Sequence, residues 1–326
     1  MKTPDGRVPT GRVVTAMALI AIMLMGALNP VQSDDLLYGL AYSPYRTGQS
    51  PEIGIYPSRK EIAQDLEHLR PLTSRLRTYG LYRSGRLVVE EALKQGYRVL
   101  GGIWLGADPM ANEQEIAVAI DIVKGRYPRL EGFIVGSEVL LRRELSPEKI
   151  LTIIRRVRQE TNMPVGYAEI APIWYEGPAI MNKIAAASDF IVIHNFPYWE
   201  GASIDTAAAA YERALNRTRE RFPAKRIIDG ETGRPASGQT VGRAVASPRN
   251  QATWFRFILE RSHRDRIFAF SAFSEEWKRK EGPAGAAWGI FKADGTLRPA
   301  IVKLLRERLR YEQPLSFKRY TSQRFN

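Results

Sequence analysis

The stretch GFIVGSEVLLRR, residues 132–143, runs from an apolar, strand-like segment into a single glutamate, Glu138. The stretch RIIDGETGRP, residues 226–235, has the same design and places Glu231 after its apolar segment. In parallel α/β folds the functional side chains follow the C-terminal ends of buried strands. The two stretches therefore predict a parallel sheet in which two strands each end in one carboxyl group.

The same unit, an apolar run followed by an amphipathic helix pattern, recurs along the chain and reaches a count of eight. Eight such units most simply close into a single (β/α)8 TIM barrel. An open doubly wound sheet is the alternative, but no G-x-G-x-x-G turn follows the first run, and polar residues follow many runs rather than one switch point. The predicted strands lie within residues 37–43, 75–80, 98–106, 132–138, 165–170, 190–199, 226–233 and 267–273.

Two of the helix patterns carry clear start signals. Ser58, followed three residues later by Glu61, predicts a capping box. Ser146 followed by Pro147 predicts a serine N-cap with proline at the first helical position. Both signals place a helix between consecutive predicted strands, as the barrel requires.

The N-terminus indicates export. Lys2, Arg7 and Arg12 precede an apolar run of 16 residues, 13–28, which is short beside the roughly 20 apolar residues of a membrane span. The small residues that follow this run are typical of a cleavable secretory signal. We therefore expect residues 1–33 to be a signal peptide or, if kept, an N-terminal membrane anchor, and the protein to be periplasmic or attached to the cell envelope.

Amino-acid composition excludes several kinds of catalytic chemistry and several kinds of partner. Residues 34–312 are long enough for one barrel, and residues 313–326 form a basic tail. The absence of cysteine excludes thiol catalysis and disulfides. The net charge of +13 comes from Lys and Arg residues scattered through the helix patterns. This distribution indicates solvated helix faces rather than a nucleic-acid site. The alternative is a basic surface with affinity for anionic envelope lipids or anionic glucans. Three histidines at no metal-ligand spacing, and no phosphate loop or G-x-S-x-G elbow, predict no metal and no cofactor.

Aromatic and charged residues follow most of the predicted strands. Sugars suit such a mixture, because their C–H faces stack on aromatic rings while their hydroxyls bond to polar side chains. Two facing carboxyl groups are what glycosidic bond cleavage requires, so the pattern predicts a retaining glycosidase or transglycosidase. Beside the two glutamates, the expected rim comprises Tyr42, Tyr45, Arg77, Tyr79, Trp104, Asp108, Ser137, Glu169, Trp174, His194, Tyr198, Trp199, Glu275, Trp277 and Lys278.

Several of these segments resemble one family. FIVGSEVLLRR is similar to the VGNEVL acid/base segment of glycoside hydrolase family 17, the β-1,3-glucanase family, and GETGRP is similar to its (G/S)ETGWP nucleophile segment. YAEIAPIW, HNFPYWEG and AFSEEWK…EGPAGAAWGIF resemble the segments on strands five, six and eight of the bacterial branch. The segments occur in the family's order, and the resemblance covers roughly residues 36–305.

The resemblance implies Glu138 as general acid/base, Glu231 as nucleophile, and Glu275 and Lys278 as supporting polar groups. It also implies a β-glucan chain as substrate. We expect a monomer with no nucleic-acid partner. The residues expected to contact the substrate are Arg77, Tyr79, Ser137, Glu169, His194, Tyr198, Trp199, Glu275, Trp277 and Lys278.

A retaining mechanism requires different surroundings for the two carboxyl groups. Glu138 must hold a proton near neutrality, so we expect it against apolar or like-charged neighbours. Glu231 must stay ionised, so we expect a cationic neighbour such as Arg77.

The sequence departs from the family pattern at three positions. Ser137 stands where the family has an Asn that can bond the sugar 2-hydroxyl, Arg234 stands where it has Trp, and Phe196 replaces a Tyr of the plant branch. These changes leave open whether the enzyme hydrolyses glucans or transfers glucosyl units, with β-1,6 links or branches as products. They also leave a second hypothesis, a non-catalytic β-glucan-binding protein on a degenerate glycosidase barrel.

Overall fold

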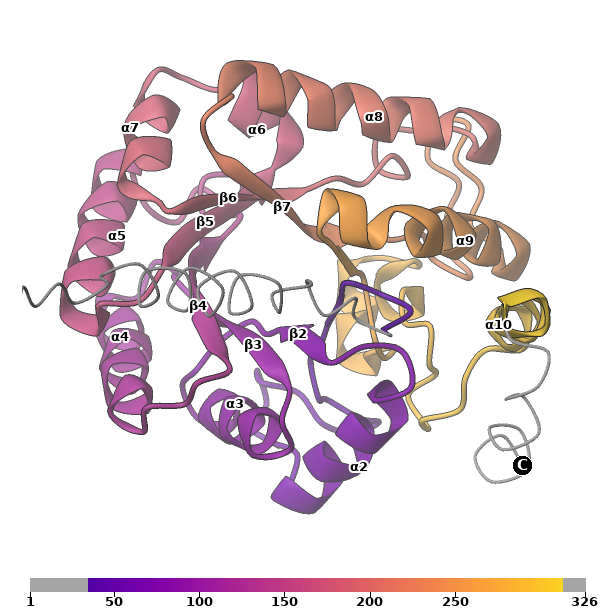
Figure 1. Cartoon of the computed structure of the whole chain (residues 1–326), viewed down its shortest axis with the longest axis horizontal. Coiled ribbons are helices and arrows are strands. Elements are labelled where there is room, and N and C mark those ends of the chain that lie inside the picture. The colour runs from indigo at the N-terminus through magenta and orange to yellow at the C-terminus, as the bar shows by residue number, and fades with distance from the viewer. Residues whose placement is uncertain (1–34, 313–326) are drawn as a thin grey trace, which may run out of the picture. The chain divides into compact units, whose positions relative to one another are not determined.

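Eight parallel strands close into a barrel in the order of the sequence, as the computed structural model of the protein shows for residues 35–312 (Figure 1). The fold prediction is confirmed, and each predicted strand range contains or overlaps an observed strand. The strands are β1 (Gly39–Ala41), β2 (Arg75–Arg77), β3 (Arg98–Ile103), β4 (Leu130–Ser137), β5 (Val165–Ile170), β6 (Phe190–His194), β7 (Arg226–Thr232) and β8 (Ile267–Ala269).

Helices surround the barrel and connect consecutive strands (Figure 1). The capping box of Ser58 and Glu61 is present at the start of the first of them, and Ser146 caps a helix that has proline in its first turn, as predicted. The helices are α2 (Arg59–Leu69), α3 (Ser84–Lys94), α4 (Pro109–Lys124), α5 (Pro147–Thr161), α6 (Ala171–Glu176), α7 (Ile180–Ala187), α8 (Ile204–Arg221), α9 (Pro248–Asp265) and α10 (Pro299–Glu312), with the short 3₁₀ helices η1 (Glu276–Glu281) and η2 (Gly285–Ala287).

Apolar side chains fill the barrel interior. This interior cluster is separate from the larger core between strands and helices, and it leaves no passage through the barrel for a substrate. A ligand therefore has to bind at an end of the barrel rather than within it. The cluster consists of Leu100, Ile134, Ala168, Phe190, Val192, Ile228 and Phe268.

Irregularities in strand pairing occur near the C-terminal ends of three strands. The register shifts between Ile134 and Ser137 on β4, between Ile193 and His194 on β6, and between Asp229 and Thr232 on β7. Such bulges change the direction of the side chains that follow them and are frequent beside active sites. Here they lie next to the strand ends that carry Glu138, His194 and Glu231.

The predicted signal peptide or anchor, residues 1–33, and the basic tail, residues 313–326, lie outside the described residues. Among the helices of residues 35–312, none combines the length and the apolar character needed to cross a bilayer. The signal peptide or membrane anchor at residues 1–33 stays a prediction.

Candidate active site

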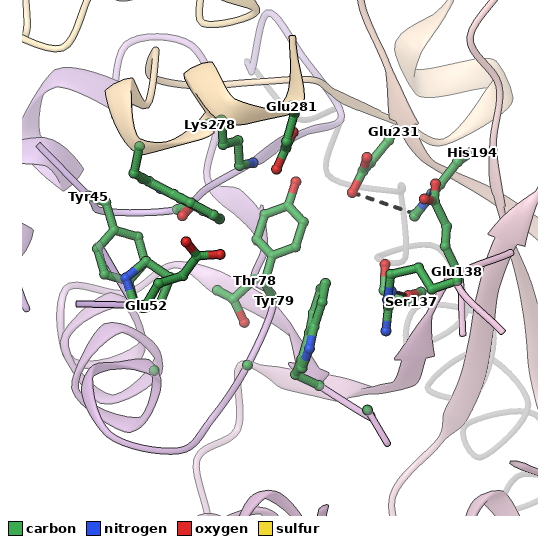
Figure 2. Close-up of a pocket in the computed structure, with 18 of the residues that line it drawn as sticks. Tyr45, Glu52, Thr78, Tyr79, Ser137, Glu138, His194, Glu231, Lys278 and Glu281 are labelled. Atoms are coloured by element: carbon green, nitrogen blue, oxygen red, sulfur yellow. Dashed lines mark hydrogen bonds and ion pairs between the residues drawn. The ribbon is translucent and has the colours of Figure 1, made fainter. Parts of the chain in front are cut away.

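Glu138 and Glu231 lie together at the C-terminal end of the barrel. Glu138 directly follows β4, and Glu231 lies in the last part of β7. One carboxylate oxygen of each lies within 4.8 Å of the other, and both residues line a cavity of about 1290 Å³. Figure 2 shows the two carboxylates on the same side of this cavity, beside His194. The two stretches that predicted strand-end glutamates thus converge on one site.

The backbone at Glu138 is held in an unusual conformation. Glu138 has a φ of 55°, in the left-handed region that a residue with a side chain seldom adopts, and Gly136, two residues before it, has a φ of 87°. The surrounding structure holds this turn, because Glu138 N donates to Ala168 O over 2.9 Å and Arg142 donates to Ser137 O. A strained, over-determined position of this kind fixes where the carboxyl group points.

Arg77 supplies the cation beside Glu231. Its Nη1 donates to Glu231 Oε1, and its Nη2 donates to Ser137 Oγ over 3.0 Å. Arg77 is only 1% exposed and lies behind the cavity rather than lining it. The expected cationic neighbour of Glu231 is therefore present, and the predicted contact of Arg77 with substrate stays a prediction.

His194 joins the two carboxyl groups. Its Nδ1 lies 2.6 Å from Glu138 Oε1, and its Nε2 lies 3.6 Å from Glu231 Oε1, the pair drawn as a dashed line in Figure 2. Arg77 Nη2, which can only donate, lies 3.3 Å from the same Nε2. While the ring is neutral, Nε2 can accept from Arg77, and the ring proton is then on Nδ1 and faces Glu138. Burial lowers the pKa of His194, but the charges of Glu231 and Glu138 and the hydrogen bond to Glu138 raise it above its ordinary value, which favours the charged ring.

The charge around Glu138 differs from the sequence-based expectation. Burial alone would raise the pKa of Glu138, but the hydrogen bond and charge of His194, with the charges of Arg77 and Arg142, outweigh burial and hold that pKa below its ordinary value. The prediction of apolar or like-charged neighbours was wrong. The reason is mainly spatial, because Arg77 and His194 come from β2 and β6, far from Glu138 in sequence, whereas Arg142 lies in the same turn as Glu138.

The same three side chains offer a possible donor set for a cation. Ligand atoms of Glu138, His194 and Glu231 all lie within 4.8 Å of one another. Arg77, however, places a fixed positive charge against Glu231 and His194, and this charge would repel a metal ion at that point. The donor set therefore fits a cation poorly, and the absence of a metal site stays a prediction.

Aromatic side chains form much of the cavity wall. Trp104, 41% exposed, lies under the guanidinium of Arg142, and Trp199, 44% exposed, lies against Tyr198 and Trp288. Exposed rings facing a groove are what stacking on sugar rings requires. Of the predicted rim residues, those that line the cavity with the two glutamates are Tyr42, Tyr45, Tyr79, Trp104, Asp108, Ser137, His194, Trp199, Trp277 and Lys278.

Glu275 and Lys278 form one side of the cavity as a pair. Lys278 Nζ lies 2.8 Å from Glu275 Oε2, and Glu275 Oε1 accepts from Trp277 Nε1 over 3.0 Å and from Ser43 Oγ. Glu275 is buried and is not among the side chains that line the cavity, so its contact with substrate stays a prediction. It positions Lys278 and Trp277, which do line it.

Three further rim residues point elsewhere. Glu169 is fully buried and accepts hydrogen bonds from Tyr167 Oη and Leu140 N, so it supports the turn after Glu138. Tyr198 is 1% exposed and donates to Gln239 O. Trp174 is buried against α8 and β6 and donates to Val192 O. The rim position of Trp174 is therefore wrong, and the substrate contacts of Glu169 and Tyr198 stay predictions.

Sequence reasoning missed Glu115. This buried carboxylate of α4 accepts hydrogen bonds from Leu81 N, Tyr82 N and Trp104 N at 2.6, 3.0 and 3.2 Å, and it lines the cavity. Burial raises the pKa of Glu115 to about 7, against the opposing effect of these bonds. A signal existed, because Glu115 lies on the same helix face as the buried Asn112, Ile116 and Ala119. Glu52 and Glu281, also on the cavity wall, carried no such signal.

Comparison with known proteins decides the family. The model of the BtgE/BtgC glycoside hydrolase domain matches residues 39–289, most of the barrel. The chain belongs to this glycoside hydrolase family.

Relatives and solved structures agree with this assignment and place the chain in glycoside hydrolase family 17. A glucan 1,3-beta-glucosidase of Schizosaccharomyces pombe is 27% identical over 252 residues, 72% of this chain and 78% of that protein. The family 17 beta-1,3-glucanosyltransferase of Rhizomucor miehei is 26% identical, with a TM-score of 0.71 over 82% of this chain and 97% of that one. An active-site mutant of the latter, in complex with laminaritriose, matches equally well. The protein is therefore an enzyme of the glycoside hydrolase class, as predicted.

The departures from the family pattern have structural roles in this glycoside hydrolase. Arg234 is buried and donates to Val245 O and Ala202 O, with Tyr198 beneath its guanidinium, so it joins two loops around the cavity. Phe196 packs edge-on against Phe270 and Trp288. Both substitutions thus lie in the packing that holds the cavity wall, where they need not remove a contact with the reacting sugar.

The pairing of His194 with Glu138 predicts a pH effect. A His194→Gln variant keeps a donor but removes the charge that lowers the pKa of Glu138, so that pKa will rise and the acid will stay protonated to higher pH. We expect the alkaline limb of kcat/KM on laminari-oligosaccharides to move to higher pH, since this limb reports the acid of the free enzyme. A His68→Gln variant, altered at the end of α2, will keep the wild-type profile. An alkaline limb that moves to lower pH in His194→Gln would contradict the assignment.

Proposed function

We propose that this enzyme is a retaining β-1,3-glucan-active glycosidase or glucanosyltransferase. The proposal rests on one observation: a carboxylate oxygen of Glu138 and one of Glu231 lie within 4.8 Å of each other on the wall of the same cavity. Carboxyl groups about 5–5.5 Å apart are typical of retaining glycosidases, whereas inverting enzymes need about 6.5–9.5 Å to admit a water molecule. The laminaritriose complex of the Rhizomucor miehei enzyme supports a β-1,3-linked glucan as the substrate class.

The proposed first step is attack by Glu231. A carboxylate oxygen of Glu231 forms a bond to the anomeric carbon as the glycosidic C–O bond breaks, and Glu138 gives its proton to the departing oxygen. Arg77 and Ser137 hold Glu231 and its neighbourhood in place during this step. His194 Nδ1, 2.6 Å from Glu138, supplies the site from which Glu138 can be reprotonated.

The second step releases the sugar from Glu231. Glu138, now a carboxylate, removes a proton from water or from a sugar hydroxyl, and the resulting oxygen attacks the anomeric carbon of the glycosyl-enzyme. Water gives hydrolysis, and a sugar acceptor gives transfer, with a new β-1,3 link or a β-1,6 link or branch. The aromatic wall around Trp104 and Trp199 supports an acceptor sugar, so we propose that transfer accompanies hydrolysis.

We also propose a cellular location for this enzyme and the branch of the family to which it belongs. The apolar run of residues 13–28 supports export to the periplasm or the cell envelope. The three strand-end segments that resemble the bacterial branch support an assignment to that branch, although the relatives compared above are fungal.

Product analysis tests the proposal. Purified protein incubated with laminari-oligosaccharides of one length will give shorter chains by hydrolysis and longer or branched chains by transfer, as read by mass spectrometry and linkage analysis. The Glu231→Gln variant will give neither. Binding of these oligosaccharides with no change in their length would instead establish the non-catalytic glucan-binding protein.

Ser137 offers a graded test of the same site. A Ser137→Asn variant restores the amide that the family pattern has at this position and that can bond the sugar 2-hydroxyl. We expect kcat/KM to rise by roughly threefold to tenfold, the usual worth of one neutral hydrogen bond. Ser137→Ala, which removes the hydroxyl that accepts from Arg77, is the matched control and will lower kcat/KM. An asparagine variant no faster than the alanine variant would contradict this role.

A further inference from the structure

One buried carboxylate, Glu115 on α4, joins two loops at the C-terminal end of the barrel. Its Oε2 accepts from Leu81 N over 2.6 Å, in the loop that follows β2, and from Trp104 N over 3.2 Å, in the loop that follows β3. Its Oε1 accepts from Tyr82 N over 3.0 Å. A single carboxyl group thus fixes the backbone of one loop relative to the other.

The loop after β2 depends on this contact for its shape. Leu81 and Tyr82 present consecutive N–H groups to the carboxylate, an arrangement in which backbone amides bind an anion. Arg83, the next residue, has a φ of 58°, in the left-handed region. Gly80 passes close to the carboxylate, since a Cβ at this position would lie 3.0 Å from Glu115 Oε1. The contact therefore stabilises a turn whose backbone conformation is otherwise unfavourable.

A second side chain of α4 supports the loop after β3. Asn112, which is also buried and lies one turn before Glu115, accepts from Gly106 N and donates to Gly106 O, both over 2.8 Å. The buried face of α4 therefore holds this loop at two points, Trp104 and Gly106. Since α4 is a continuous helix of 16 residues, both contacts share one rigid support.

Each of the two loops places an exposed aromatic ring on the cavity wall. The rings are those of Tyr82 and Trp104, and both line the cavity. Exposed aromatic faces are the surfaces on which sugar rings stack. The proposed catalytic glutamates belong to other segments, the turn after β4 and the end of β7. The hydrogen bonds of Glu115 therefore set the positions of two rings and not those of the reacting carboxyl groups.

The three N–H donors around Glu115 require a carboxylate rather than its amide. A carboxylate has two oxygens that only accept, whereas glutamine has one oxygen that accepts and one nitrogen that only donates. In a Glu115→Gln variant the amide nitrogen faces either Tyr82 N or the pair of Leu81 N and Trp104 N, so at least one buried donor loses its partner. An unsatisfied buried donor destabilises the arrangement that contains it. Glutamine thus weakens the contact while the size of the side chain stays the same.

We propose that Glu115 is a positioning residue that holds Tyr82 and Trp104 as one subsite, for a glucosyl unit other than the one that Glu231 attacks. The inference rests on the proposed function and adds a structural cause for chain-length preference, because a long β-1,3-glucan oligosaccharide can fill this subsite and the reacting site together. Loss of the carboxylate will therefore weaken the binding of long chains and leave the chemical step nearly unchanged.

Kinetics on laminaritriose and laminarihexaose test the inference, at pH 8, where a carboxyl group with a pKa of about 7 is mostly ionised. Glu115→Gln will raise KM for the hexaose by about fivefold to tenfold, and will change KM for the triose, and kcat on both, by less than about twofold. Glu113→Gln, on the exposed side of the same helix, removes a carboxylate that pairs with Arg156 and will match the wild type. A Glu115→Gln variant that loses kcat equally on both substrates would overturn the proposal.

Removal of the two rings shows whether Glu115 acts through them. In a variant with both Tyr82→Ala and Trp104→Ala, KM for the hexaose will already be high, and adding Glu115→Gln will raise it no further. A further rise by the same factor would overturn the proposal. So would a double ring variant that keeps the wild-type preference for the hexaose, an outcome that does not depend on whether Glu115→Gln folds. Calorimetric titration with both oligosaccharides gives Kd without turnover. If the wild type binds them but cleaves neither, the proposed function is overturned, while the ratio of the two Kd values still decides the role of Glu115.

Discussion

Replacing Glu231 with glutamine will lower kcat on laminari-oligosaccharides by about 10⁴-fold or more, the scale seen when a catalytic nucleophile is removed. The neutral amide has nearly the shape of the carboxyl group but cannot form the glycosyl-enzyme. Substrate binding will persist, because the aromatic cavity wall is unchanged. Steady-state kinetics and calorimetric titration with the same oligosaccharide separate the two effects.

A matched control is available on the same cavity wall. Glu281→Gln removes another carboxylate of the cavity wall, on η1, whose charge acts on Glu231 through space, and will change kcat by no more than about tenfold. A Glu231→Gln variant that retains comparable activity would remove Glu231 from the mechanism.

Azide can separate the roles of the two glutamates. In a Glu138→Ala variant an aryl β-glucoside whose leaving group needs no proton will still form the glycosyl-enzyme, and azide, which needs no general base, will attack it and give a glycosyl azide of retained, β configuration. In a Glu231→Gly variant azide will take the place of the nucleophile and give the α product. Nuclear magnetic resonance of the products distinguishes the two, and an α azide from Glu138→Ala would reverse the assignments.

Replacing Arg77 with methionine will cost about 3–5 kcal/mol of folding free energy, because it leaves a buried carboxylate without its partner. Arg77 is 1% exposed and its guanidinium bonds to both Glu231 and Ser137. Methionine fills much of the same space, so the loss will come from charge rather than from a cavity. Denaturant unfolding followed by circular dichroism measures it, and activity will fall as Glu231 loses its orientation.

A double variant isolates the electrostatic part. Arg77→Met combined with Glu231→Gln removes both charges, and we expect it to be more stable than Arg77→Met alone. Arg98→Met breaks the more exposed pair with Glu131 and will cost no more than about 1 kcal/mol. If the double variant were as unstable as Arg77→Met, packing and not charge would explain the role of Arg77.

Alternating strand and helix patterns predicted the barrel well because they are local. Each apolar run, such as residues 98–106 and 190–199, reports burial on both faces of a strand, and Ser58 and Ser146 mark helix starts through bonds within one turn. The strand count then left little choice of topology. Glu138 and Glu231 could be located from the same patterns, since both directly follow or end such a run.

The direction in which a side chain points could not be predicted from these local sequence patterns. Glu169 ends a strand-like run just as Glu138 and Glu231 do, but it points into the packing and bonds to Tyr167 and Leu140. The bulges on β4, β6 and β7 change the direction of the side chains beside the cavity, and no residue pattern in this sequence predicts these bulges. Glu115 was missed for the opposite reason, since it reaches the cavity from a helix.

The sequence by itself determined the eightfold order of strands and helices and the two glutamates at the ends of β4 and β7, because both follow from interactions between neighbours along the chain. Only the tertiary structure decided the charges that act on these glutamates. Arg77 and His194 come from β2 and β6, and closing the barrel brings them within reach of Glu138 and Glu231, whereas Arg142 lies in the same turn as Glu138. Electrostatic energies depend on distance in space and not on separation in sequence.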